Sequence, residues 1–205
     1  MRCLLFDLDG VLVDTRPLVV ATVHDTAQIL NLAPRDAAAV EAALGLAPSQ
    51  VARQLFPGNP AARTTITQRF AHHLDSASPC SGIRELLTRA GAQLPLGVVT
   101  SRNRQEAERC LRGAGLKQFF RAVITWGDTT RHKPAPDPLL EGLRQLGGSG
   151  GVYIGDTPGD MRAAQAAGLL PIGAGWASSY GDADLRRAGA ALVAQHPLEV
   201  LPHLH

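Results

Sequence analysis

Cysteine is scarce in this chain, and its few cysteines are not arranged to bind a metal. Cys3, Cys80 and Cys110 are an odd number, lie far apart and form no Cys-x-x-Cys pair. This spacing suggests neither a zinc site nor a disulfide framework. Unpaired cysteines are most simply explained by a reducing compartment.

Long hydrophobic runs and a strong net charge are also missing. The apolar run at the N-terminus is interrupted by Asp7 and is too short for a signal peptide. No stretch approaches the ~20 apolar residues of a membrane span. The net charge is only +2, so neither a nucleic acid nor a membrane is expected as the main partner. We therefore expect a cytoplasmic protein.

The composition is that of an ordinary globular protein, with 45% hydrophobic and 19% charged residues among 205. From residue 82 onward, short apolar runs alternate with helical patterns. The expected strands are Leu96–Val99, Ala122–Ile124, Val152–Ile154, Leu169–Ile172 and Ala191–Val193. The expected helices are 103–114, 137–146, 158–167 and 182–188. With one more buried strand in residues 1–8, this alternation predicts an α/β, Rossmann-like three-layer core around a parallel sheet.

Residues 16–80 have a different pattern. Apolar residues recur there at helical spacing, and prolines separate the candidate helices. Three or four helices are expected, with no clear strand. We therefore predict a core of residues 1–15 and 81–205, interrupted by a small α-helical cap domain at 16–80. Long insertions of this kind are usually functional, and lids are common among them.

The stretch CLLFDLDGVLVDT near the N-terminus places carboxylates directly after an apolar strand. A hairpin is one explanation, because Asp9-Gly10 suits a type I′ turn. A calcium-binding loop is excluded, since it would begin at Leu5 and end at Arg16, where acids are required. The other explanation is a binding site, because ligands of parallel sheets bind beyond the carboxyl ends of the strands. Asp7 and Asp9 would then lie at that edge.

Three further strand ends carry polar side chains. Thr100 and Ser101 follow one strand, where they could form an anion site or simply cap a helix. Lys133 follows another strand, ahead of prolines that stiffen the backbone. In a chain with eighteen arginines and two lysines, it could be retained for its compact charge or be an ordinary surface lysine. Asp156 and Asp160 follow the third, and a helix cap would explain only the second of them.

All these groups are expected on one edge of one sheet. Clustered acids repel one another unless a cation lies between them. Hard oxygen ligands suit Mg²⁺, which often shares an oxygen with a bound phosphate. Thr100 and Lys133 would hold the other phosphate oxygens. The pattern predicts a site for phosphoryl transfer.

This arrangement resembles the haloacid dehalogenase-like hydrolase superfamily along the whole chain. DLDGVLVD at 7–14 resembles its first motif, Thr100 the second, Lys133 the third, and GDTPGD at 155–160 the fourth. The helical insertion resembles the cap that some members carry between motifs one and two. Within the superfamily, the chain looks most like phosphoglycolate phosphatases and their pyrophosphatase and sugar-phosphatase relatives.

The resemblance implies the chemical roles of the acids. Asp7 would be the nucleophile and would form an aspartyl-phosphate. Asp9 would be the general acid for the leaving group and then the base for the attacking water. Mg²⁺ would be held by Asp7, by the backbone carbonyl of Asp9 and by Asp156. Asp160 would act at the metal directly or through water.

The resemblance also implies which groups bind the substrate. Thr100 and Lys133 would stabilise charge on the phosphoryl group, with Ser101 beside them. The Gly45–Ser49 loop is expected to face the active site. Cationic or titratable cap residues could contact the substrate or lie on a solvated helix face; these are Arg53, Arg63, Arg69, His72 and His73. The helix around Arg102, Arg104, Arg109 and Arg112 is expected at the surface, with internal ion pairs to Glu106 and Glu108.

Other activities of the superfamily depend on single residues. The name-giving dehalogenases lack the second acid, so Asp9 argues against dehalogenation. Phosphonate-cleaving relatives use a cap lysine, and residues 16–80 contain none. β-Phosphoglucomutases keep an arginine shortly after a cap glycine, and here Arg53 lies eight residues after Gly45, which weakens that interpretation without excluding it. A catalytically silent phosphometabolite-binding protein is disfavoured because Asp7 and Asp9 are both present.

We therefore expect a Mg²⁺-dependent phosphatase that acts on a small phosphorylated metabolite. Phosphoglycolate is the leading candidate substrate. A pyrophosphatase and a phosphosugar mutase are the alternatives, and the enzyme is expected to be a monomer or a homodimer.

Overall fold

A six-stranded parallel sheet forms the centre of the molecule in the computed structural model, which describes residues 1–44, 46 and 48–204. The strands are β1 (Arg2–Phe6), β4 (Leu96–Val99), β5 (Ala122–Ile124), β6 (Gly150–Gly155), β7 (Leu170–Ala174) and β8 (Leu192–Ala194). Their order is β5-β4-β1-β6-β7-β8, and every neighbouring pair is parallel. The predicted Rossmann-like α/β fold is confirmed.

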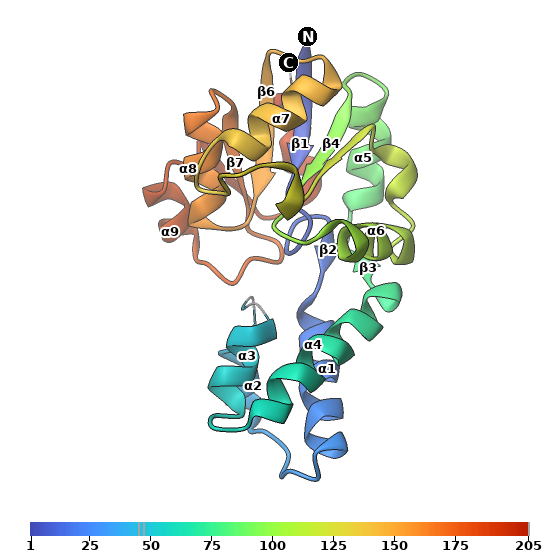
Figure 1. The fold of residues 1–205 in the computed structure, drawn as a ribbon. Coiled ribbons are helices and arrows are strands. Elements are labelled where there is room, and N and C mark those ends of the chain that lie inside the picture. Colours follow the sequence, from blue (N-terminus) through green and yellow to red (C-terminus); the bar gives the residue numbers. More distant parts are fainter. Residues whose placement is uncertain (45, 47, 205) are drawn as a thin grey trace.

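Helices cover both faces of this sheet (Figure 1). They are α5 (Ile83–Gly91), α6 (Arg104–Gly113), α7 (Asp137–Leu146), α8 (Pro158–Ala166) and α9 (Asp182–Arg187). Leu4 and Phe6 of β1 belong to the cluster that includes α5 and α6, whereas Leu5 belongs to the cluster that includes α7 and α8. Successive residues of a strand point to opposite faces, so β1 contributes to both cores.

The helical segment comprises α1 (Arg16–Ile29), α2 (Ala37–Glu41), α3 (Pro48–Leu55) and α4 (Pro60–His73), called the cap helices below. They lie opposite the carboxyl ends of the sheet strands (Figure 1). Short 3₁₀ turns occur at Leu74–Ser76, Lys117–Phe119, Trp126–Asp128 and Pro197–His203. No helix among the described residues has both the length and the apolar character that crossing a membrane would require.

Two short strands connect the core to the cap helices. β2 (Val13–Asp14) pairs antiparallel with β3 (Ser78–Pro79). The hairpin interpretation of Asp9-Gly10 is therefore wrong, because both neighbours of β1 are parallel strands and the partner of β2 is β3. The expectation of no clear strand within 16–80 is also wrong, because β3 lies in that range. Turn propensity is a local property and cannot identify a partner more than sixty residues away.

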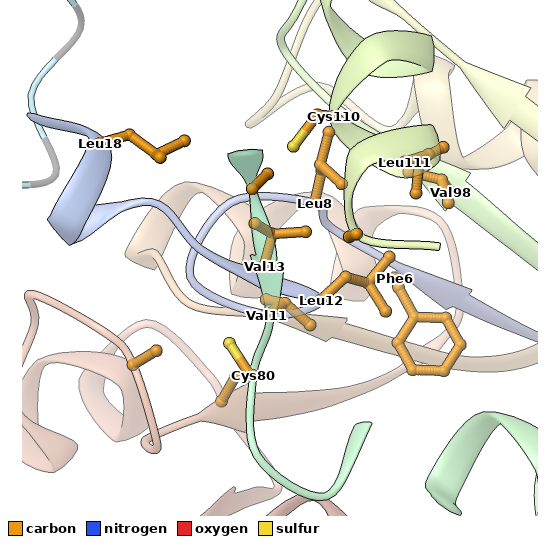
Figure 2. Packing of buried hydrophobic residues seen from close by; sticks show 14 of the residues in the cluster. Phe6, Leu8, Val11, Leu12, Val13, Leu18, Cys80, Val98, Cys110 and Leu111 are labelled. Atoms are coloured by element: carbon orange, nitrogen blue, oxygen red, sulfur yellow. The ribbon is translucent and has the colours of Figure 1, made fainter. Parts of the chain in front are cut away.

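The loop between β1 and β2 is held by its apolar residues. Leu8, Val11, Leu12 and Val13 are fully buried and pack with Phe6 (Figure 2). The carbonyl of Leu8 accepts hydrogen bonds from the backbone N–H groups of Leu12 and Val13, each at 3.0 Å. Because the leucine between the two acids is anchored in the core, the acids are held at the sheet edge.

Candidate active site

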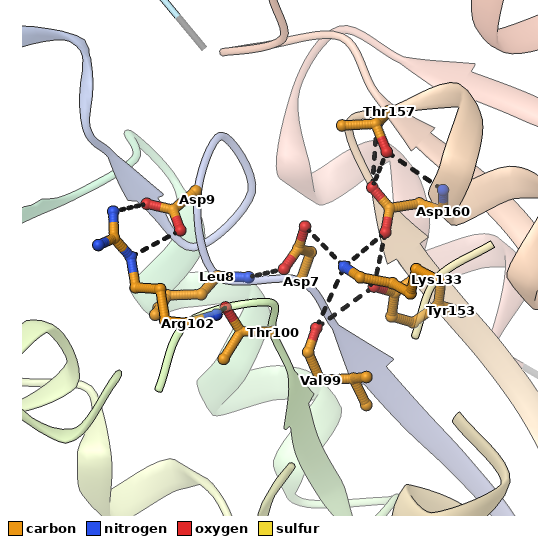
Figure 3. Close-up of polar contacts among 10 residues, drawn as sticks. All are labelled: Asp7, Leu8, Asp9, Val99, Thr100, Arg102, Lys133, Tyr153, Thr157 and Asp160. Carbon is orange, nitrogen blue, oxygen red and sulfur yellow. Dashed lines mark hydrogen bonds and ion pairs between the residues drawn. The ribbon is translucent and has the colours of Figure 1, made fainter. Parts of the chain in front are cut away.

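Asp7 lies where β1 ends and is 8% exposed. Its backbone N–H donates to the carbonyl of Ile154 at 2.8 Å, which extends the ladder between β1 and β6. Its Oδ1 accepts a hydrogen bond from the N–H of Leu8 at 2.7 Å, and its Oδ2 lies 3.0 Å from Nζ of Lys133 (Figure 3). The strand therefore delivers a buried carboxylate in a fixed orientation.

Lys133 is buried between two of the predicted acids. Its Nζ lies 2.7 Å from Oδ1 of Asp160 and 3.0 Å from Oδ2 of Asp7, and it donates to the hydroxyl of Tyr153 at 3.0 Å. Burial alone would lower the pKa of Lys133, but Asp160 and Asp7 outweigh burial and raise it well above its usual value. Lys133 is a charged, buried group, and the surface-lysine interpretation is wrong.

Asp160 is fully buried and belongs to a capping box. Its Oδ2 accepts from the N–H and the hydroxyl of Thr157 at 3.0 and 2.6 Å, and its Oδ1 accepts from the hydroxyl of Tyr153 at 2.9 Å. Burial would raise the pKa of Asp160, but Lys133 and these hydrogen bonds lower it. The helix-cap explanation is thus correct for Asp160, and the same carboxylate also contacts the buried lysine.

Three acids converge at the carboxyl ends of β1 and β6. Carboxylate oxygens of Asp7, Asp156 and Asp160 all lie within 4.8 Å of one another. Burial raises the pKa of Asp7 to about 7, with Asp160 and Asp9 adding to the rise and Lys133 opposing it. The pKa of Asp156 is raised well above its usual value, mainly by burial and further by the charges of Asp7 and Asp160. One lysine faces three carboxylates, so the cluster fits a hard divalent cation.

Thr100 and Ser101 follow β4 and face the same space. The N–H of Thr100 donates to the carbonyl of Ile124 at 2.9 Å. Neither residue caps the next helix, because the N-cap of α6 is Asn103, whose side chain accepts from the N–H of Glu106 at 2.9 Å. The helix-cap explanation is wrong for this pair.

A cavity of about 350 Å³ lies above these groups. Its core side is formed by Asp7, Asp9, Gly10, Thr100, Ser101, Arg102, Glu106, Asp156, Thr157, Ala177 and Ser179. Its cap side is formed by Arg16, Val19, Leu46, Pro48 and Phe70, and Asp14 and Thr15 lie at the junction between core and cap. The structure thus brings Asp7, Asp9, Thr100, Ser101 and Asp156 to one cavity. Lys133 and Asp160 lie behind its lining, where Lys133 pairs with Asp7 and Asp160 accepts a hydrogen bond from Thr157.

A sequence profile of the haloacid dehalogenase-like hydrolase family matches residues 4–174. The chain belongs to this family.

Relatives match along most of the chain. It is 29% identical to N-acetylmuramic acid 6-phosphate phosphatase of Pseudomonas aeruginosa, covering 98% of this chain and 93% of that protein. It is 31% identical to phosphoglycolate phosphatase of Pectobacterium atrosepticum, covering 89% and 84%. A crystal structure of a subfamily IA hydrolase from Geobacter sulfurreducens superposes with a TM-score of 0.81 at 22% identity, covering 100% and 97%. The predicted membership in this hydrolase family is confirmed, and the named phosphatases agree with the predicted phosphoric monoester hydrolase.

The cationic and titratable cap residues that the sequence singled out do not line the active-site cavity. Arg69 and His73 bind Asp25, with nitrogen–oxygen distances of 2.7 and 3.0 Å. Arg53 and Arg63 line a separate cavity of about 420 Å³ between α3 and α4. Of the Gly45–Ser49 loop, Leu46 and Pro48 line the active-site cavity, whereas Gly45 and Ala47 lie outside the described residues. Among the described residues of the cavity, the cationic side chains are Arg16 and Arg102.

Arg102 is not a surface residue, contrary to expectation. Its side chain is 12% exposed and binds Asp9 through two nitrogens, at 2.8 and 2.7 Å (Figure 3). The expected internal ion pairs do occur, at 3.6 Å between Arg102 and Glu106 and at 3.5 Å between Arg112 and Glu108. Arg104 and Arg109 instead pair outside their helix, with Asp128 and Asp75. Tyr153 was not predicted as a site residue, because it stands within an apolar run that predicts only a buried strand.

The backbone conformation at Gly10 and its closeness to Asp156 both require glycine at this position. Its φ is +69°, and an added Cβ would contact the Asp156 carboxylate, lying 2.8 Å from its Cγ. Gly58 has a φ of +73° with open space around it. We expect Gly10→Ala and Gly58→Ala each to lower the free energy of unfolding by about 1–2 kcal/mol. Gly10→Ala alone should also displace Asp156, and it should weaken the binding of a divalent cation by the three-carboxylate cluster by about 10–100-fold.

Denaturant unfolding and Mg²⁺ titration of both variants test this prediction. Equal Mg²⁺ affinity in the two variants would contradict the role assigned to Gly10.

The stability of the metal-free enzyme should fall as pH rises. Folding raises the pKa of Asp7 to about 7 and that of Asp156 as well. The folded state therefore holds protons that the unfolded state releases, and its stabilisation is lost as pH rises through about 7. Between about pH 5 and 8 we expect a loss on the order of 2–3 kcal/mol. Saturating Mg²⁺ should restore stability mainly at the high-pH end.

Thermal unfolding at several pH values, with chelator and with Mg²⁺, measures this effect. Asp156→Asn removes one of the repelling charges and should flatten the metal-free curve. A curve that is flat in the unmodified enzyme would argue against mutual repulsion of the cluster.

Proposed function

We propose that this enzyme is a Mg²⁺-dependent phosphatase that hydrolyses a small phosphorylated metabolite through a phosphorylated Asp7. The ion network on the cavity floor supports this most strongly. Lys133 lies 3.0 Å from Asp7 and 2.7 Å from Asp160, and Asp156 completes a group of three carboxylates. A nucleophile, a fixed cation and a divalent-metal site in one cavity are the parts that phosphoryl transfer needs.

The metal is expected to bind the carboxylates of Asp7 and Asp156 and the backbone carbonyl of Asp9, with Asp160 acting at the metal directly or through water. When bound, Mg²⁺ would neutralise the charge that develops on the phosphoryl oxygens. Thr100 and Ser101 would donate hydrogen bonds to these oxygens, and Lys133 would add a positive charge beneath them. Asp160 already binds Tyr153 and Thr157, so its orientation is set before any ligand arrives.

The reaction would proceed in two displacements. In the first, an Asp7 oxygen attacks phosphorus, the bond from phosphorus to the leaving oxygen breaks, and a proton of Asp9 passes to that oxygen. In the second, water attacks the phosphorylated Asp7. The bond between phosphorus and the Asp7 oxygen then breaks, the proton of the water passes to Asp9, and phosphate is released.

The cavity favours a small anionic substrate. Its volume of about 350 Å³ is at the lower end of the range of about 300–1,000 Å³ for small-molecule sites. Its cap side is largely apolar, with Val19, Leu46, Pro48 and Phe70. The side chain of Arg16 is 43% exposed at this wall and already pairs with Asp14 through Nε and Nη2, at 2.8 and 2.7 Å, so its Nη1 would be the group that meets a carboxylate on the substrate. Phosphoglycolate therefore remains our leading candidate substrate. We also propose that residues 16–80 form a helical cap domain at this cavity.

Phosphate release from a substrate panel tests the proposal. The panel contains phosphoglycolate, sugar phosphates, nucleotides and pyrophosphate, each with Mg²⁺ and with chelator. We expect metal-dependent release, fastest with phosphoglycolate. Preference for pyrophosphate would indicate a pyrophosphatase, and isomerisation of β-glucose 1-phosphate without release would indicate a mutase. Binding without turnover would indicate a silent binding protein.

We further propose a cytoplasmic location and a monomeric or homodimeric state. The buried, unpaired Cys3, Cys80 and Cys110 agree with a reducing compartment. Size-exclusion chromatography with light scattering would give the oligomeric state.

A further inference from the structure

The hydroxyl of Tyr153 lies between Lys133 and Asp160, behind the lining of the active-site cavity. Nζ of Lys133 donates to this hydroxyl at 3.0 Å, and the hydroxyl donates to Oδ1 of Asp160 at 2.9 Å. The same Oδ1 lies 2.7 Å from Nζ, so the three groups form a closed triangle of contacts (Figure 3). Tyr153 and Asp160 are fully buried, so bulk water does not compete for these contacts.

The hydroxyl of Tyr153 is not needed to fill the core. Tyr153 stands in β6, and it belongs to the apolar cluster that contains Leu5, Leu139 and Leu143. The ring of a phenylalanine would occupy the same space, and a buried hydroxyl without a partner destabilises a protein. The contribution of the hydroxyl therefore lies in its hydrogen bonds, because it accepts one and donates another.

The number of hydrogens on Lys133 gives the tyrosine contact a directional effect. An ammonium carries three N–H donors. Asp160 and Tyr153 engage two of them, at 2.7 and 3.0 Å, and the third is left for Oδ2 of Asp7 at 3.0 Å. The carbonyl of Val99 is a further acceptor at 3.5 Å. Without the tyrosine hydroxyl, the ammonium is free to turn toward Val99, and its third N–H is no longer aimed at Asp7.

We propose that Tyr153 is a positioning residue that aims the Lys133 ammonium at the phosphoryl group during the reaction. This inference rests on the proposed two-step phosphatase mechanism. When an Asp7 oxygen bonds to phosphorus in the first displacement, the carboxyl group of Asp7 loses its own negative charge, and its contact with Lys133 weakens. Tyr153 and Asp160 are unchanged by that step. They keep Lys133 in place while its third N–H meets a phosphoryl oxygen.

Tyr153→Phe tests the proposal, because it removes the hydroxyl and keeps the ring. The probes are p-nitrophenyl phosphate and the best substrate of the panel, each with saturating Mg²⁺. We expect kcat to fall by about 10–100-fold at nearly unchanged KM, because Lys133 stabilises charge that develops in the transition state. Tyr180→Phe is the matched control. Tyr180 is the other tyrosine of the chain, is 47% exposed and lines a different cavity, so kcat should stay unchanged.

A double-mutant cycle with Lys133→Met separates positioning from a structural role. If Tyr153 acts through Lys133, adding Tyr153→Phe to Lys133→Met should lower kcat by less than about twofold. A purely structural role would lower kcat by the same factor with and without Lys133.

Nuclear magnetic resonance gives a readout that does not depend on turnover. Lys117 and Lys133 are the two lysines of the chain, so labelling lysine with ¹⁵N marks two ammonium groups. The buried ammonium of Lys133 should exchange its protons slowly with water and give a signal, whereas Lys117 is 42% exposed and should exchange fast. In Tyr153→Phe the Lys133 signal should be lost through faster exchange, and in Tyr180→Phe it should remain.

Three results would overturn the proposal. They are an unchanged kcat in Tyr153→Phe, an equal fall of kcat with and without Lys133, and an unchanged Lys133 signal in Tyr153→Phe. Each of these results leaves the phosphatase itself in place, because the parent enzyme still releases phosphate in a metal-dependent way. Turnover that survives in Asp7→Asn would instead overturn the proposed function, and this inference with it.

Discussion

Asp7→Asn is expected to lower kcat by about 10⁴-fold or more, because the amide cannot form the covalent intermediate. The fold should be unaffected. Asparagine has nearly the same shape and can still accept the hydrogen bond that Leu8 donates at 2.7 Å. The variant removes one of three mutually repelling carboxylates, but its amide NH₂ group replaces the oxygen that lies 3.0 Å from Lys133. Because these two effects oppose each other, the free energy of unfolding of the metal-free protein at pH 8 should stay within about 1–2 kcal/mol of the parent.

The measurement is phosphate release under saturating Mg²⁺, together with denaturant unfolding of both proteins. Asp36→Asn is the matched control, because Asp36 is an exposed helix cap, accepting from the N–H of Ala39, and asparagine caps equally well. It should leave both quantities unchanged. Turnover by Asp7→Asn within tenfold of the parent would exclude Asp7 as the nucleophile.

Lys133→Met is expected to have the largest effect on stability. The side chain of Lys133 is 9% exposed, and its ammonium compensates Asp7 and Asp160 together. Removing one partner of a buried ion network leaves uncompensated charge, which typically costs about 3–5 kcal/mol. Methionine retains most of the side-chain volume, so the loss would reflect charge more than packing. We expect this cost in the metal-free protein at pH 8, and a smaller cost at pH 5, where Asp7 and Asp156 hold protons.

The chain offers one other lysine as a control. Lys117 is 42% exposed and lies 3.8 Å from Glu108, so Lys117→Met should cost less than about 1 kcal/mol. Urea unfolding at both pH values compares the two variants. Turnover of Lys133→Met should also fall by about 10²–10³-fold in Mg²⁺. Equal stability of the two variants would mean that the buried network contributes little.

Much of the core was predictable because its signals are local. Apolar runs between helical patterns marked the sheet strands, although β6 proved longer than Val152–Ile154 and begins at Gly150. The acids and the lysine at strand ends were recognisable because a parallel sheet brings the carboxyl ends of its strands to one edge. Asp7 meets Asp156 and Lys133 there although it is more than a hundred residues from either of them along the chain.

The errors concern partners that local spacing does not reveal. Glu106 stands four residues after Arg102, so the sequence favoured a helical surface pair, yet the buried contact is to Asp9, 93 residues away. The cap arginines had no distinguishing neighbours in sequence. Which of them faces the core depends on helix packing, and Arg69 proved to pair with Asp25 of another cap helix. Tyr153 gave no signal because its ring suits an apolar strand.

The antiparallel pairing of β2 and β3 places the two ends of the helical segment side by side, Val13 opposite Pro79 and Asp14 opposite Ser78. An insertion whose two ends lie side by side disturbs the surrounding fold little, because a short turn could connect the same two strands. The segment can therefore be exchanged, lengthened or lost while Asp7, Lys133 and Asp160 keep their geometry. In such an architecture, selection can change what the enzyme recognises separately from how it reacts.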